Sequence, residues 1–246
     1  MTSPSSLAGR RIVITRPTGK AEGLADRLRA LGALPILFPT IRLEPADPGP
    51  MDAAARDIDT FDWVVFTSRQ GVDSFVERLE AVGRRAADLS ARSVAAIGPA
   101  TADALRAHGI EPALVPAEYV AEAILAEIGD VKGRRILLPR ADIARAALAD
   151  GLKERGAKVV EIAAYRTVGS GARVPALDGV DAVTFTSSST VRHFVDSGAV
   201  VGSARVVCIG PVTAGTAREL GLTVHAVAEE YTEDGLIKAL EGVFRS

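Results

Sequence analysis

The sequence predicts an α/β protein made of two similar doubly wound parallel-sheet domains that are joined by two extended crossovers, with a cleft between them. Two observations carry this prediction. Short apolar runs alternate with longer amphipathic segments along the 246 residues. Three sequence blocks also recur in the same order in the second half of the chain, which is typical of a duplicated unit.

Six apolar runs are the expected buried strands, because strands covered on both faces read as nearly continuous hydrophobic segments. The runs are Arg11–Thr15, Trp63–Thr67, Val94–Ile97, Arg135–Leu138, Ala182–Thr186 and Arg205–Ile209. Between them, Leu24, Leu28 and Leu31 have helical spacing, and so do Leu148 and Leu152. Strands that alternate with helices form βαβ units and therefore a parallel sheet.

The repeated blocks indicate a duplicated unit of about 115–125 residues. The pairs are Gly9–Ile12 with Gly133–Ile136, Asp62–Ser68 with Asp181–Ser187, and Ile97–Thr101 with Ile209–Thr213. The third pair also aligns Tyr119 with Tyr231, whose rings are expected to pack with their hydroxyls near the rim. The repetition leaves two pairings open: each half of the chain folds by itself, or the middle forms one domain and the two ends form the other.

Two extended segments, near 38–45 and 163–169, hold corresponding places and are the expected crossovers. Turn-rich stretches at 45–50 and 169–171 follow them and are expected to be loops. Tyr165 lies in the second crossover, where the two domains would meet. It is therefore either a structural ring or a candidate proton donor.

The composition excludes several classes of partner. The formal net charge is -2, from 29 basic and 31 acidic side chains, so no basic field exists to hold nucleic acid or an anionic membrane. Cys208 is the only cysteine and lies in an apolar run, which predicts a buried, inert thiol. The first residues lack the pattern of a signal peptide, and the apolar runs are too short to span a membrane. A cytoplasmic protein is expected.

The residues that follow the predicted strands favour an anionic ligand. In open α/β sheets ligands bind outside the carboxyl ends of the strands, where helix N-termini present free N–H groups. The candidate binding residues at these ends are Arg16, Thr67, Ser68, Gly98, Thr101, Arg140, Thr186, Ser187, Ser188, Gly210 and Thr213. Hydroxyls, arginines and glycine turns suit carboxylates or phosphates, although serine and threonine are also ordinary helix caps.

Motifs for cofactors and metals are absent from the sequence. No G-x-G-x-x-G opens a helix, and neither G-x-x-x-x-G-K-[ST] nor H-E-x-x-H occurs. The three histidines are scattered, and together with one cysteine they offer no ligand set for a metal. We therefore expect neither a cofactor nor a metal.

Taken together, these blocks resemble the uroporphyrinogen-III synthase family over nearly the whole chain, from about Leu7 to Leu240. The matching segments are Ile14–Pro17, Phe66–Ser68, Ala96–Ala102, Arg140 with the helix Leu148–Gly156, Phe185–Ser189 and Ile209–Ala214. The resemblance implies the second pairing, with residues 1–41 and 169–246 in one domain and 44–166 in the other.

The resemblance also implies a cofactor-independent lyase of heme biosynthesis. Its substrate would be hydroxymethylbilane, a linear tetrapyrrole with eight carboxylates, which the family cyclises with inversion of ring D and loss of water. The strand-end residues would bind the carboxylates, Tyr165 would assist the departure of water, and the protein would act as a monomer. The alternative is a cytoplasmic two-lobed protein that binds a small anion, or a regulatory relative, without catalysis.

Overall fold

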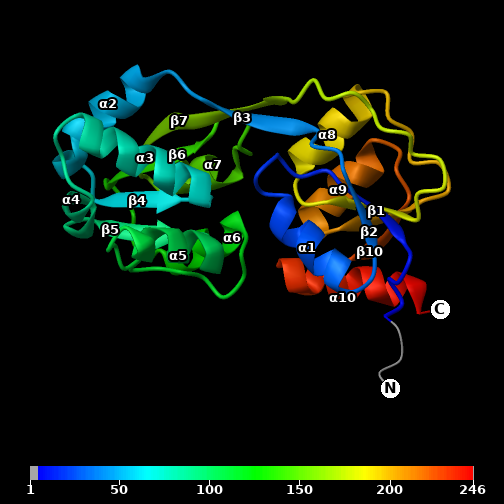
Figure 1. Ribbon diagram of the computed structural model, residues 1–246. Helices are drawn as coiled ribbons and strands as arrows, with labels where there is room; N and C mark the ends of the chain where they lie inside the picture. The colour runs from blue at the N-terminus through cyan, green and yellow to red at the C-terminus, as the bar shows by residue number, and fades with distance from the viewer. Residues whose placement is uncertain (1–4, 246) are drawn as a thin grey trace. The chain divides into compact units, whose positions relative to one another are not determined.

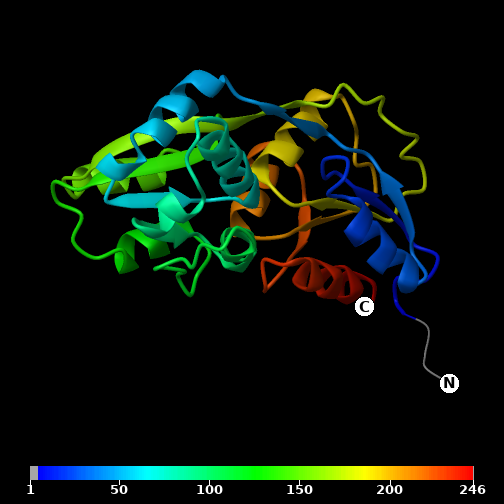
Figure 2. The same ribbon diagram turned by 60° about the vertical axis from the view of Figure 1, so that its left-hand side comes forward.

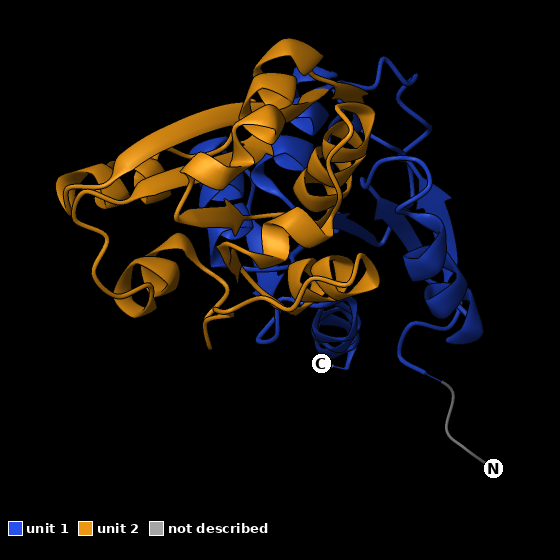
Figure 3. Cartoon of the chain, turned by 90° about the vertical axis from the view of Figure 1, so that its left-hand side faces the viewer, with its two compact units in different colours: residues 1–43, 168–246 blue, residues 44–167 orange. Residues whose placement is uncertain are grey.

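The computed structural model describes residues 5–245, which are organised around two parallel sheets (Figure 1). The first sheet has the strand order β10-β9-β8-β1-β2, and the second has the order β3-β7-β6-β4-β5. Residues up to 43 and from 168 onward form unit 1, and residues 44–167 form unit 2 (Figure 3). The predicted α/β fold with two parallel sheets is confirmed.

The sheet of unit 1 brings both ends of the chain together. Its strands are β1 (Arg11–Ile14), β2 (Leu34–Leu37), β8 (Ala182–Phe185), β9 (Arg205–Cys208) and β10 (Val224–Val227). Its helices are α1 (Glu22–Ala30), α8 (Ser188–Asp196), α9 (Pro211–Glu219) and α10 (Glu233–Phe244). Strand β1 lies between β2 and β8, with Ile12 opposite both Pro35 and Ala182.

Unit 2 repeats this plan within the middle of the chain. Its sheet contains β3 (Ile41–Pro45), β4 (Trp63–Phe66), β5 (Ser93–Ala96), β6 (Arg135–Ala141) and β7 (Lys158–Gly169), although the first residues of β3 and the last of β7 are counted in unit 1. Its helices are α2 (Pro48–Arg56), α3 (Arg69–Ala81), α4 (Ala87–Ser90), α5 (Pro99–Ala107), α6 (Ala121–Glu127) and α7 (Ala147–Glu154), with a 3-10 turn at Ile58–Thr60. The predicted domains, 1–41 with 169–246 and 44–166, differ from the two units by at most two residues at each boundary.

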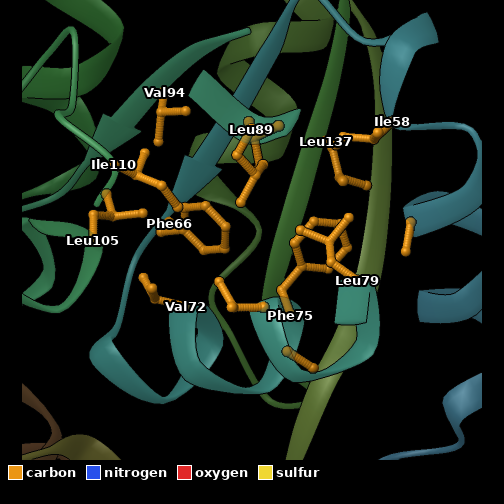
Figure 4. Close-up of a cluster of buried hydrophobic side chains, with 14 of the residues drawn as sticks. Ile58, Phe66, Val72, Phe75, Leu79, Leu89, Val94, Leu105, Ile110 and Leu137 are labelled. Atoms are coloured by element: carbon orange, nitrogen blue, oxygen red, sulfur yellow. The ribbon is translucent and has the colours of Figure 1, made fainter. Parts of the chain in front are cut away.

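Helices cover both faces of each sheet, which is why the central strands are apolar along their whole length (Figures 1 and 2). In β1, Ile12 and Ile14 pack with residues of α1 and α10, whereas Val13 packs with residues of α8 and α9. In unit 2, Phe66 of β4 packs against Phe75 of α3 with ring centroids 6.1 Å apart (Figure 4). These cores hold the carboxyl ends of the strands, and hence the helix starts, in place.

The edge strands β2 and β10 were not predicted. Both are only partly buried. The apolar run of β2 contains Pro35, which argues against a strand, and His225 interrupts the run of β10. The predicted loop at 45–50 was also wrong in part, because Pro48 begins α2. The side chain of Asp47 accepts a hydrogen bond from the N–H of Gly49 at 3.0 Å, and proline at the first helical position sacrifices no helical hydrogen bond.

An aspartate at the start of β4 and another at the start of β8 hold the two copies of the Gly-Arg-Arg-Ile block. Asp181 accepts hydrogen bonds from the Arg10 guanidinium at 2.7 Å and from the Arg11 N–H at 2.8 Å. In unit 2, Asp62 accepts from the Arg134 guanidinium at 2.9 Å and from the Arg135 N–H at 2.8 Å. These pairs could not be predicted from the sequence, because the aspartates are distant in the chain from the arginines.

We expect Asp62→Asn and Asp181→Asn each to lower the free energy of unfolding at pH 7 by about 1 kcal/mol. The hydrogen bond from the Arg135 N–H lowers the pKa of Asp62. Burial raises the pKa of Asp181, but the bonds from Arg11 and Arg10 outweigh it, and the net shift is downward. Denaturant titrations should therefore show the difference above the ordinary aspartate pKa of about 4 and its loss at lower pH, as the folded-state carboxylates are protonated. A difference that does not change with pH would contradict the role of the charge.

Candidate active site

Each unit has two kinds of helix start at the carboxyl ends of its strands. Helices α3 and α8 follow β4 and β8 and begin after Ser68 and Ser187. Helices α5 and α9 follow β5 and β9 and begin after Gly98 and Gly210. Because the strands of each sheet are parallel, both kinds of start lie at the same edge of their own sheet.

The serine starts are capped by their own side chains. Ser68 Oγ accepts a hydrogen bond from the Gly71 N–H at 3.0 Å. Ser187 Oγ accepts from the Thr190 N–H at 3.3 Å, and Thr190 Oγ1 accepts from the Ser187 N–H at the same distance. A cap uses a lone pair of the hydroxyl oxygen, so capping leaves the hydroxyl proton for another acceptor. At Ser68 that acceptor can be a ligand, whereas Ser187 Oγ also shares a hydrogen bond with Ser189 Oγ at 2.9 Å.

The residues beside the serine starts complete this half of the predicted set. Thr67 and Thr186 directly precede the capping serines and are half-buried. No hydrogen bond of either hydroxyl occurs within residues 5–245. Ser188 is different, because its Oγ accepts a hydrogen bond from Thr216 Oγ1 at 2.7 Å.

The glycine starts have no side-chain cap. Thr101 and Thr213, each three residues after the glycine, are only 4% and 5% exposed. In the part of the chain that the structure describes, neither threonine hydroxyl has a hydrogen-bond partner. Arg92 Nε is the only buried side-chain nitrogen or oxygen without a partner among these residues, so both threonine hydroxyls reach the surface of their nearly buried residues. An uncapped helix start also leaves N–H groups free, and an anionic oxygen bound there could accept from both kinds of donor.

The two predicted arginines are engaged inside their own units. Arg16 forms an ion pair with Glu233 at the start of α10. Arg140 is 8% exposed, forms an ion pair with Glu161, and donates to the carbonyl oxygen of Arg145 at 2.8 Å. No signal in the sequence pointed to these glutamates, which come from distant parts of the chain. A substrate carboxylate would have to exchange with them.

Tyr165 and Ser68, which the sequence identified separately, are in contact. The Tyr165 hydroxyl of β7 donates a hydrogen bond to Ser68 Oγ at 3.1 Å. Burial raises the pKa of Tyr165; the bond with Ser68 opposes this shift, and Asp142 adds to it. The phenol therefore stays protonated at neutral pH. Because Ser68 Oγ accepts from both Tyr165 and Gly71, its own proton is left to be donated outward.

The remaining chemistry-bearing residues do not form a second centre. No group of three or more His, Cys, Asp and Glu side chains within residues 5–245 could hold a metal ion. Cys208 is buried, as predicted, and burial raises the pKa of its thiol to about 12, so that the thiolate nucleophile does not form at neutral pH. None of the helices among these residues combines the length and the apolar character needed to cross a membrane.

Comparison with known proteins explains this arrangement. The family model described as uroporphyrinogen-III synthase HemD matches residues 22–238. The chain belongs to the uroporphyrinogen-III synthase family. The resemblance seen in the sequence is thereby confirmed, and the protein is an enzyme of tetrapyrrole biosynthesis with the lyase class of that family.

Relatives in the uroporphyrinogen-III synthase family span nearly all of the chain. The uroporphyrinogen-III synthase of Synechococcus elongatus is 34% identical over 96% of both chains. A putative uroporphyrinogen-III synthase of Methanothermobacter thermautotrophicus is 32% identical over 93% of this chain and 96% of its own. A crystal structure of a mutant uroporphyrinogen III synthase from Thermus thermophilus has the same fold, with a TM-score of 0.71 at 21% identity over 96% of this chain and 99% of that one.

Proposed function

We propose that this protein converts hydroxymethylbilane into uroporphyrinogen III by closing the linear tetrapyrrole, inverting ring D and releasing water. The observation that carries the proposal is the pair of accessible threonine hydroxyls at uncapped helix starts, Thr101 in unit 2 and Thr213 in unit 1, which have no hydrogen-bond partner within residues 5–245. Each unit thus offers the same kind of site for a carboxylate. The substrate presents carboxylates along its whole length, so it has several groups that such a site can bind.

Backbone and hydroxyl donors share the binding of these carboxylates in our proposal. N–H groups at the helix starts, with the hydroxyls nearby, replace the water that solvates each carboxylate. The proposed contacts are Thr67, Ser68, Gly98, Thr101, Thr186, Ser187, Ser188, Gly210 and Thr213. Arg16 and Arg140 would join after exchanging their glutamate partners. Because many donors share the task, no single side chain should be indispensable.

The proton for the departing hydroxyl group is proposed to come from Tyr165 through Ser68. As the C–O bond breaks, Ser68 donates its outward proton to the leaving oxygen and Tyr165 donates to Ser68. Water leaves, and the substrate becomes an azafulvene-like cation. Ring D then attacks at its substituted carbon to form a spiro intermediate. Rearrangement completes the macrocycle, and the proton that the substrate loses returns through Ser68 to Tyr165. Spontaneous closure does not use that carbon. The protein must therefore hold the linear tetrapyrrole in the orientation that favours the attack.

The decisive assay is incubation with hydroxymethylbilane, oxidation of the product, and chromatographic identification of the porphyrin isomer. Uncatalysed closure gives the uninverted isomer, so we expect isomer III to predominate when the protein is present. If the protein bound the substrate and only the uninverted isomer appeared, the chain would be an anion-binding relative without catalysis.

We expect activity to survive exhaustive treatment with EDTA and dialysis, because the described side chains offer no ligand set for a metal. The rate of isomer III formation before and after treatment measures this. A loss of activity that added Mg²⁺ or Zn²⁺ restores would overturn the cofactor-free mechanism.

We further propose that the protein works as a cytoplasmic monomer with no nucleic-acid partner. The formal net charge of -2 supports the absence of a polyanion-binding surface. Sedimentation equilibrium at micromolar protein concentration should return the monomer mass of 25.6 kDa.

A further inference from the structure

Two tyrosines, one in each unit, remain exposed beside the glycine helix starts. Tyr119 and Tyr231 are 38% and 40% exposed, among the few large hydrophobic side chains that are not covered. They hold corresponding places in the duplicated sequence, after β5 and α5 in unit 2 and after β9 and α9 in unit 1. Because both tyrosines hold this position, the same explanation for their exposure should apply to both units.

Each tyrosine ring lies directly against the glycine that begins the neighbouring helix. A Cβ atom added at Gly98 would lie 3.1 Å from Cγ of Tyr119, and one added at Gly210 would lie 3.3 Å from Cδ1 of Tyr231. A side chain at either position would require the ring to shift by a few tenths of an ångström. The two glycines therefore allow the aromatic rings to lie close to the helix starts that also carry Thr101 and Thr213.

Packing alone does not account for this arrangement. A ring that serves only as core filler is buried, and a tyrosine hydroxyl held by the protein normally finds a hydrogen-bond partner. Here much of each ring is left in water, and neither hydroxyl has a partner within residues 5–245. In unit 1, Val212 on the first turn of α9 adds a further exposed apolar side chain, 37% exposed. Each carboxylate site thus has a flat apolar surface at its side.

We propose that Tyr119 and Tyr231 are stacking platforms for pyrrole rings of the substrate, an inference that rests on the proposed function. Each pyrrole of a linear tetrapyrrole carries acidic side chains a few bonds from a flat aromatic ring. A carboxylate bound at the uncapped helix start would leave its own pyrrole beside the tyrosine. Offset or edge-to-face contact between the two rings is favourable beyond the apolar area that it buries.

The two tyrosines are positioning residues, since neither touches the reacting carbon in this arrangement. Their contribution should be the same before and during ring closure, so it appears in KM and leaves kcat unchanged. The flat face is what binds, so phenylalanine should replace tyrosine and leucine should not. This pattern separates stacking from a purely structural role.

The test compares Tyr119→Leu and Tyr231→Leu with Tyr119→Phe and Tyr231→Phe in steady-state kinetics of isomer III formation. Each leucine variant should raise KM about 3- to 10-fold with kcat within about twofold of wild type, and each phenylalanine variant should keep KM within about twofold. The double leucine variant should show the product of the two effects. Val200→Ala is the control for loss of surface apolar area, because this side chain is 74% exposed and lies before the amino end of β9, opposite to the end that leads into α9.

Thermal denaturation of the same variants separates the possible failures. Unchanged KM in the leucine variants, or equal rises in KM for leucine and phenylalanine with lowered melting temperatures, would overturn the platforms while the proposed function stands. A wild-type protein that forms no isomer III would overturn the proposed function and the platforms together.

Discussion

Replacing Tyr165 with phenylalanine is expected to lower the turnover of hydroxymethylbilane by about 10²-fold or more, while the fold and the affinity for product stay near wild type. The variant keeps the ring in β7 and removes only the donor to Ser68 Oγ, which lies 3.1 Å away. The raised pKa of the phenol keeps the proton in place across the neutral range, so wild-type activity should not fall through ionisation of Tyr165 below about pH 10.

Tyr165→Ala and Ser68→Ala provide the comparison for this experiment. Ser68→Ala removes the relay hydroxyl but also the cap of α3, so it should lower both turnover and stability, the latter by about 0.5–2 kcal/mol. Single-turnover rates, together with melting temperatures, separate the two effects. If Tyr165→Phe turned over normally and only Tyr165→Ala lost activity, the ring would brace β7 and the proton would come from another group.

The second large effect is expected from Thr101→Val and Thr213→Val. Each should raise KM by about 5- to 150-fold, which corresponds to about 1–3 kcal/mol of lost binding, and the double variant should approach the product of the two. The melting temperature should stay near that of the wild type. The reason is that valine has nearly the same shape, and the hydroxyl that it removes has no partner in the described part of the chain.

Thr184→Val is the matched control for the threonine variants. Thr184 is also buried, at 1% exposure, but its hydroxyl donates to the Val13 carbonyl oxygen at 2.8 Å. Its replacement should therefore lower stability by about 1 kcal/mol and leave KM unchanged. Abolished activity in each single variant at Thr101 or Thr213, with folding intact, would contradict binding that is shared among many donors.

The sequence was sufficient for the central strands and insufficient for the sheet edges. Strands such as β4 are buried on both faces and so carry a continuous apolar run. The half-exposed strands β2 and β10 are interrupted by Pro35 and His225. The polar residues at the carboxyl end of a strand can also be predicted from local sequence, because strand, turn and helix start follow one another in the chain.

Side-chain partnerships between distant segments could not be predicted. Nothing near Arg16 in sequence points to Glu233, and nothing near Tyr165 points to Ser68. Such pairs depend on which strands become neighbours. The repetition of blocks left that open until the family resemblance favoured one of the two pairings.

The interrupted path of the chain through unit 1 has a consequence for synthesis on the ribosome. Strand β1 ends at Ile14, but its neighbour β8 begins only at Ala182, after every strand from β4 to β7 has been made. At a synthesis rate of about 5–20 residues per second, the apolar side chains of β1 remain without that neighbour for on the order of ten seconds. All strands of unit 2 have been synthesised by then, so unit 2 can already fold. The nascent chain should therefore become protease-resistant first in its middle, and its first strand should be the segment most dependent on chaperones.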